Sequence, residues 1–147
     1  MLIMGSPLLQ VAQKPAVYLV VLGEAPDWFV QALENGLEEE GIPCEKRDSQ
    51  ENDAILAASQ AAKASRINVG LSVKAAAGGA ITGVVLHHRD LPEKRPLFHL
   101  TWEEVSQESL YRLGRNAARL VKGNPFIMDP ADTAGPCGDS GTKDKLN

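Results

Sequence analysis

Three consecutive carboxylates, Glu38-Glu39-Glu40, are the residues of this sequence best suited to hold a hard cation. The pattern before them predicts a helix that ends here, so their charges oppose the helix dipole at about 0.3–1 kcal/mol each. Two interpretations follow. The triplet is either a solvated helix end whose charge is screened by salt, or a set of carboxylates kept for a basic partner or a divalent cation. One carboxylate cannot hold Mg²⁺ alone, so the other ligands would come from another chain.

A second charged cluster consists of Arg112, Arg115, Arg119 and Lys122. Their spacing of three and four residues places them on one face of a helix. Such a face is commonly solvated, and the alternative is a docking surface for an acidic partner.

Signals for catalysis or metal binding within the chain are weak. Ser72 lies in a stretch that resembles a nucleophile elbow, but Lys74 stands where the second glycine is required. His87 and His88 are neighbours in a predicted strand and therefore point to opposite faces. With His99 on another strand, they cannot complete a tetrahedral metal site. We therefore expect no catalytic residue here.

A phosphate-binding loop is also missing. The glycines at 78–83 are followed by Val84-Val85, where the loop motif requires lysine and a hydroxyl residue. The sequence therefore predicts that this chain alone binds no nucleotide.

The first elements that would position these residues are a buried strand at 16–22 and a helix at 26–40. The strand is continuously apolar, as strands of parallel sheets are. Pro26 fits the first helical position, and Gly41 and Pro43 end the helix. The predicted buried stripe of the helix consists of Phe29, Leu33, Gly36 and Leu37.

The next elements are a strand at 42–46, an alanine-rich helix at 49–64 and a strand at 67–73. We expect Ile55, Leu56 and Ala62 to face inward from this helix. Only a short turn separates the third strand from a fourth at 81–87, so these two strands should form an antiparallel hairpin. The sequence thus predicts an α/β fold with a mixed sheet.

A short strand at 97–100 and a long helix complete the predicted domain. Thr101 and Glu104 match a capping box that would start the helix, and Gly123 with Pro125 would end it. We expect a flexible leader at 1–14, a single domain at 15–127 and a disordered tail at 128–147.

Composition narrows the classes of function. The chain has 147 residues and a net charge of −4, which argues against a nucleic-acid binder that needs a basic face. The longest apolar stretch is too short to span a membrane, and no signal peptide is recognisable. The two cysteines form no paired motif, so we expect a cytoplasmic protein.

Two longer segments give the chain a family resemblance. Residues 36–43, GLEEEGIP, and residues 116–126, NAARLVKGNPF, resemble the small subunit of diol/glycerol dehydratase-reactivating factors. Val69-Gly70, Leu91-Pro92 and the segment 96–98 match the order and spacing of that family. The resemblance covers about residues 15–127.

The resemblance implies a three-layer α/β/α subunit with a mixed, mostly parallel sheet of about five strands, similar to the medium subunit of the B12-dependent dehydratase. It implies a non-enzymatic, chaperone-like role in a heterotetramer of two small and two large subunits, with the ATPase in the actin-like large subunit. Such factors rescue suicide-inactivated dehydratase by subunit exchange, which releases damaged cobalamin.

The family also implies a role for the acidic triplet. The middle residue, Glu39, would hold a divalent cation such as Mg²⁺ together with ligands of the large subunit. Glu38 and Glu40, with Arg112, Arg115 and Arg119, are candidate contacts with the partner.

Two rival functions stay open from sequence alone. One is a cobalamin-binding, medium-subunit-like component of a dehydratase, and the other is a small hydrolase that would depend on Ser72 and the histidines. The sequence does not distinguish a diol from a glycerol dehydratase as client. It also leaves open the oligomeric state of the isolated chain and any association with a bacterial microcompartment.

Overall fold

The computed structural model describes residues 15–128 as three helices, a 3₁₀ turn and one five-stranded sheet. In chain order these elements are β1 (Val17–Leu22), α2 (Asp27–Glu39), β2 (Cys44–Arg47), α3 (Ala54–Ala64), β3 (Val69–Ala75), β4 (Ile81–His88), β5 (Phe98–Thr101), η1 (Trp102–Glu104) and α4 (Gln107–Lys122). The expected leader at 1–14 and all but the first residue of the expected tail lie outside the described residues, and those expectations stay predictions.

The sheet has the strand order β2-β1-β3-β4-β5. β1 pairs in parallel with β2 and β3, whereas β4 pairs antiparallel with both β3 and β5. Four strands therefore run in one direction, and β4 is reversed by the hairpin. The expected mixed, mostly parallel sheet is confirmed.

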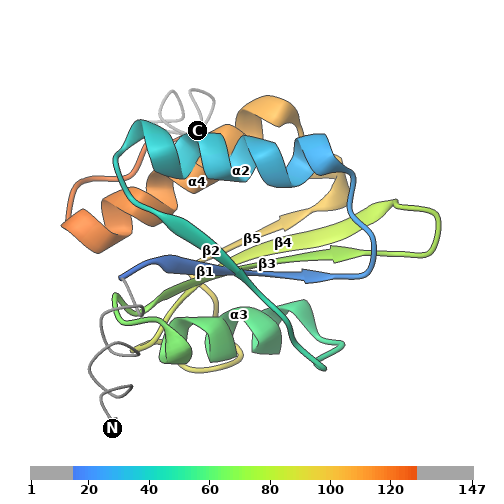
Figure 1. Cartoon of the computed structure of the whole chain (residues 1–147), viewed down its shortest axis with the longest axis horizontal. Coiled ribbons are helices and arrows are strands. Elements are labelled where there is room, and N and C mark those ends of the chain that lie inside the picture. Colours follow the sequence, from blue (N-terminus) through green and yellow to red (C-terminus); the bar gives the residue numbers. More distant parts are fainter. Residues whose placement is uncertain (1–14, 129–147) are drawn as a thin grey trace, which may run out of the picture.

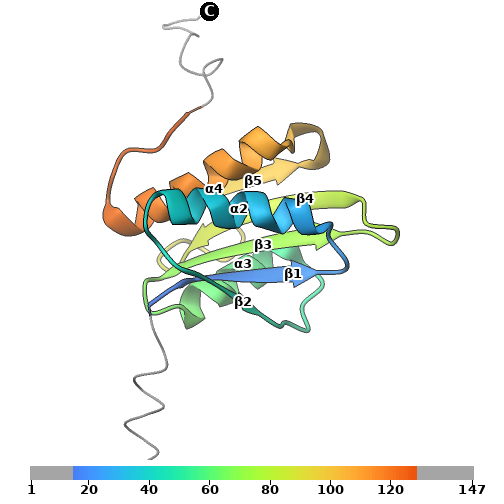
Figure 2. The same cartoon turned by 45° about the horizontal axis from the view of Figure 1, so that its top comes forward.

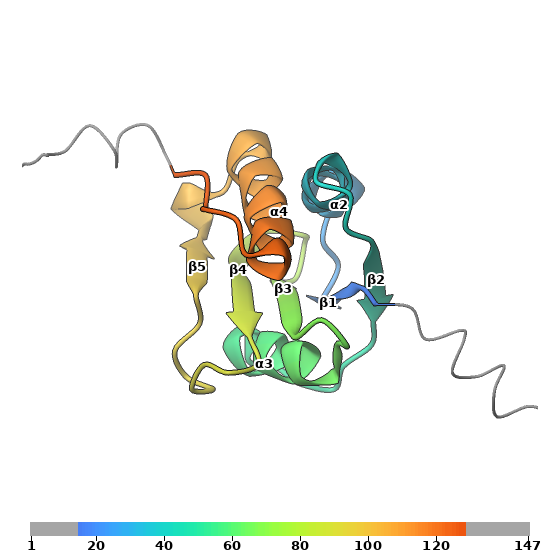
Figure 3. The same ribbon diagram turned by 90° about the vertical axis from the view of Figure 1, so that its left-hand side faces the viewer.

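The helices form two layers around the sheet. Helices α2 and α4 lie side by side on one face, and α3 covers the other (Figures 1 and 3). Seen from above their face, α2 and α4 run in the same direction, so their carboxyl ends lie at the same end of the molecule (Figure 2). The three-layer α/β/α expectation is confirmed.

The main core lies between the sheet and the paired helices. It contains the predicted stripe of α2, with Phe29, Leu33 and Leu37 at most 1% exposed. On the opposite face, α3 packs through alanines against β1, β3 and β4. Of the three residues predicted to face inward from α3, Ala62 is fully buried and Ile55 is partly buried against Ala54, Ala58 and Val85, as expected. Leu56 is only half-buried and belongs to no core cluster of the described residues, so the prediction was wrong for this residue. Small side chains let α3 lie close to the sheet, which Gly70 also permits.

Three predicted helix starts are shifted. The alanine-rich helix begins at Ala54, after its N-cap Asp53, and not at residue 49. Pro26 is the N-cap rather than the first helical residue, because its ψ of 147° is extended. The Thr101–Glu104 capping box begins the 3₁₀ turn η1, and not the long helix α4. Val105 then takes an extended conformation, and Ser106 caps α4 by accepting a hydrogen bond from Ser109 N at 3.0 Å.

Candidate functional site

The acidic triplet lies where α2 ends, beside the last turn of α4. Glu39 is the last helical residue, and Gly41 takes the left-handed conformation, φ +80°, that the sequence predicts. Glu38 and Glu39 are exposed, whereas Glu40 turns toward α4. The three carboxylates therefore have different environments.

Glu40 is held by three cations of α4. Its Oε2 accepts hydrogen bonds from Arg115 Nε at 3.0 Å and Arg119 Nε at 3.1 Å. Lys122 Nζ donates to Glu40 Oε1 at 2.8 Å and to the Glu40 carbonyl oxygen at 3.0 Å. Only 9% of the Glu40 side chain is exposed. We call this set the Glu40 cluster.

The cluster explains how the chain tolerates an acidic helix end. The hydrogen bond from Lys122, opposed by burial and supported by Arg115 and Arg119, lowers the pKa of Glu40 to about 2. The carboxyl group therefore stays ionised at neutral pH. Lys122 also satisfies a carbonyl at the end of α2, which places positive charge where the helix dipole is negative.

Glu39, like Glu38, faces solvent with no partner among the described residues. Within residues 15–128, neither Glu38 nor Glu39 makes a side-chain hydrogen bond or an ion pair. Mg²⁺ prefers carboxylate oxygens and keeps several other ligands, so the donor type of Glu39 fits this ion. No group of three His, Cys, Asp or Glu side chains in the described part of the chain could complete the site. Any further protein ligands would have to come from elsewhere.

The basic residues predicted to share one face have two locations. Arg115, Arg119 and Lys122 belong to the Glu40 cluster, whereas Arg112 lies one turn earlier in α4. There it lines a hollow of about 300 Å³ beside Phe98 and Ile127.

The candidate catalytic residues have structural roles. The buried Ser72 hydroxyl donates to the Ala54 carbonyl oxygen at 2.6 Å, which ties β3 to the start of α3. His87 is fully buried, with Nε2 3.0 Å from the Glu93 carbonyl oxygen and Nδ1 3.0 Å from His88 N. Burial raises the pKa of the Cys44 thiol to about 12, so it is a poor nucleophile.

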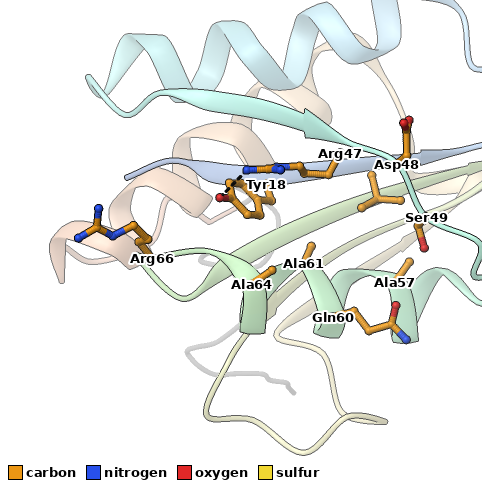
Figure 4. A pocket seen from close by; sticks show the side chains of 10 residues that line it. Tyr18, Arg47, Asp48, Ser49, Ala57, Gln60, Ala61, Ala64 and Arg66 are labelled. Carbon is orange, nitrogen blue, oxygen red and sulfur yellow. Dashed lines mark hydrogen bonds between the residues drawn. The ribbon is translucent and has the colours of Figure 1, made fainter. Parts of the chain in front are cut away.

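A cleft of about 400 Å³, which the sequence does not predict, lies between the edge of the sheet and α3 (Figure 4). The Arg47 guanidinium lies 4.2 Å from the centre of the Tyr18 ring and donates to its hydroxyl at 2.8 Å. Alanines of α3 line the opposite wall. Their spacing, at positions 57, 61 and 64, was the one sequence signal for this hollow. No lining residue of this cleft forms a nucleophile–base pair with another.

None of the helices in the described part of the chain is long and apolar enough to cross a membrane.

Comparison with known proteins gives a family. The family model "Dehydratase medium subunit" matches residues 14–127. The propanediol dehydratase-reactivating factor small subunits of Salmonella typhimurium and Citrobacter freundii are 36% and 41% identical over 112 residues. That alignment spans 76% of this chain and 90% of each relative. The diol dehydratase-reactivating factor small subunit of Klebsiella michiganensis is 35% identical, covering 76% of this chain and 83% of the relative.

Solved structures agree with this result. A diol dehydratase-reactivating factor complexed with ADP and Mg²⁺ matches with a TM-score of 0.68 and 31% identity, covering 78% of this chain and 99% of that chain. A glycerol dehydratase reactivase matches with a TM-score of 0.69 and 29% identity, covering 78% and 98%.

The chain therefore belongs to the dehydratase medium-subunit family. The more particular resemblance, to the small subunits of dehydratase-reactivating factors, is confirmed by the relatives just described.

Proposed function

We propose that this chain is the small subunit of a factor that reactivates a B12-dependent diol or glycerol dehydratase. The observation that carries the proposal is the 35–41% identity to such subunits over 83–90% of their length. The chain's role is non-catalytic and chaperone-like. Nucleotide hydrolysis belongs to a large partner subunit, in a cytoplasmic assembly of two large and two small chains.

In this proposal the small subunit takes the place of the dehydratase medium subunit at an interface that either chain can occupy. The fold that this chain shares with dehydratase medium subunits supports competition for the same docking face. Occupying that face would open the dehydratase and release damaged cobalamin. The nucleotide on the large subunit would set which partner the small subunit prefers, through a difference in affinity between two states.

Glu39 is the proposed contact with a divalent cation shared with the large subunit. Its exposure and lack of an internal partner support this role, and so does the capture of Glu40 within the chain. When bound, the ion would link the Glu39 carboxylate to oxygen ligands of the partner. Glu38 and Arg112 are proposed as flanking contacts.

Replacing Glu39 by glutamine is expected to weaken Mg²⁺-dependent assembly at least about tenfold, since the amide keeps the shape but loses the charged ligand. The measurement is affinity for the large subunit in Mg²⁺ and in EDTA, with light scattering after size-exclusion chromatography to give the stoichiometry. Glu38→Gln is the matched comparison, because it removes an adjacent exposed carboxylate that is not proposed to hold the ion. As a flanking contact, Glu38 should affect affinity equally in Mg²⁺ and in EDTA. If the affinity of the Glu39→Gln variant depends on Mg²⁺ as strongly as that of the parent, Glu39 does not bind the cation.

The second candidate function is a cobalamin-binding component like the dehydratase medium subunit, which the family description favours. Titration of the purified chain with cobalamin, followed by absorbance, separates the two. Tight binding to this chain alone would favour the second candidate, whereas no binding together with complex formation would favour the reactivating factor.

A further inference from the structure

Two exposed tryptophans lie at the end of the molecule opposite the Glu40 cluster. Trp28, in the first turn of α2, is 50% exposed, and Trp102, in η1, is 67% exposed. Both line an open cleft of about 520 Å³, together with Pro26, Phe29, Gly79, Ala80, Ile81, Thr82 and Val105. We call it the tryptophan cleft. The starts of α2 and α4 and the β3–β4 hairpin meet at this end of the molecule (Figure 1).

The cleft has the chemistry of a protein-binding surface. Tryptophan is enriched among the residues that dominate binding energy, and it buries a large apolar area when a partner covers it. The chain contains two tryptophans in all, and both lie here rather than in the core. Contiguous exposed apolar surface of this kind marks an interaction site.

Exposed carboxylates on the elements that carry the cleft set the charge of its partner. Glu24 precedes α2, Asp27 begins it, Glu103 lies in η1 and Glu108 lies in the first turn of α4. No lysine or arginine within the described residues lines the cleft. A second copy placed symmetrically on the cleft would bring like charges together, so complementarity favours a different chain with basic side chains around an apolar one.

The cleft is continuous with the proposed metal contact along the outer face of α2. Exposed residues at helical spacing form one stripe along α2, which consists of Trp28, Gln31, Asn35 and Glu39. The eleven helical steps from Trp28 to Glu39 span about 17 Å along the helix axis. A standard interface of about 800 Å² per partner is wide enough to include both ends.

We propose that the tryptophan cleft is a second anchor for the large subunit, which inserts an apolar side chain flanked by lysine or arginine while it shares the cation at Glu39. The identity of this partner rests on the proposed function. The apolar anchor does not need the metal, whereas the Glu39 contact does.

The first test uses the two tryptophans as reporters. The chain is labelled with 5-fluorotryptophan and its two ¹⁹F resonances are followed while the unlabelled large subunit is added. Both resonances should shift and lose their sensitivity to exchange of H₂O for D₂O. If the complex forms and neither resonance responds, the anchor is wrong although the proposed function stands. If no complex forms with Mg²⁺ or with EDTA, the proposed function itself fails and the anchor fails with it.

The second test separates the two anchors. Trp28→Ala should weaken binding to the large subunit at least about 30-fold in both Mg²⁺ and EDTA. Glu39→Gln, in contrast, should weaken it in Mg²⁺ only. Trp28→Phe should recover part of the loss, and Gln60→Ala, at an exposed position of α3 on the other side of the sheet, should change nothing. Circular dichroism checks that each variant is folded. Unchanged affinity in Trp28→Ala, or resonances that shift with the concentration of this chain alone, would overturn the proposal.

Discussion

Replacing Gly114 by alanine is expected to destabilise the protein by about 1–3 kcal/mol or more, because α2 and α4 pack backbone against backbone at this point. A Cβ atom on Gly114 would overlap the Leu33 carbonyl group, and one on Gly36 would overlap the Tyr111 carbonyl oxygen. Main-chain atoms cannot avoid the added Cβ by rotating to another rotamer, as a side chain could. The two helices would therefore have to separate. The measurement is the free energy of unfolding in urea, followed by circular dichroism.

The control for this prediction is Gly41→Ala. Gly41 has φ +80° and no atom near the position of an added Cβ, so alanine there meets only backbone strain of about 1–2 kcal/mol. In an exposed helix, glycine to alanine would instead stabilise by about 0.5–1 kcal/mol. A Gly114→Ala variant as stable as the parent would show that the close approach of the helices is not needed.

Glu40→Gln is expected to destabilise the protein at neutral pH through the loss of charge rather than of volume. The amide is similar in size to the carboxylate, but it leaves Arg115, Arg119 and Lys122 close together without their shared counter-charge. Loss of one partner from a well-enclosed charge network leaves the others uncompensated. The urea midpoint of the variant should therefore lie below that of the parent at pH 7.

The pH dependence of that difference checks its cause. The pKa of Glu40 is lowered in the folded state, from 4.5 to about 2. Its stabilising contribution is thus complete above pH 4.5 and is lost as the pH falls toward 2. The parent and Glu40→Gln should converge over this interval. If the difference in stability between the parent and Glu40→Gln stays constant from pH 7 to pH 2, the variant is destabilised by poorer packing and not by the loss of charge.

Local signals predicted most of the fold. The apolar run at 16–22, the glycine–proline pairs after α2 and α4, and the short turn between β3 and β4 each act within a few residues, and the structure has these features. The misplaced capping box shows the limit of such signals. Thr101 and Glu104 satisfy their local rule, but Val105 packs against the core and breaks the helix there.

The candidate site was less accessible to sequence analysis because its key contacts join residues far apart in the chain. Glu40 and Arg115 are separated by 75 positions and meet only because α2 and α4 run in the same direction on one face. The exposure of Trp28 and Trp102 had no comparable signal, since tryptophans are more often expected in a core.

The edges of the sheet have a consequence for the free subunit. β2 and β5, the two outermost strands, have only four residues each. The exposed part of β2 is Glu45-Lys46-Arg47, so a strand added there would have to lie against three consecutive charges. Short, charged edges discourage the stacking of strands from separate molecules into aggregates. Neither edge of this sheet therefore favours pairing with a strand of a second molecule.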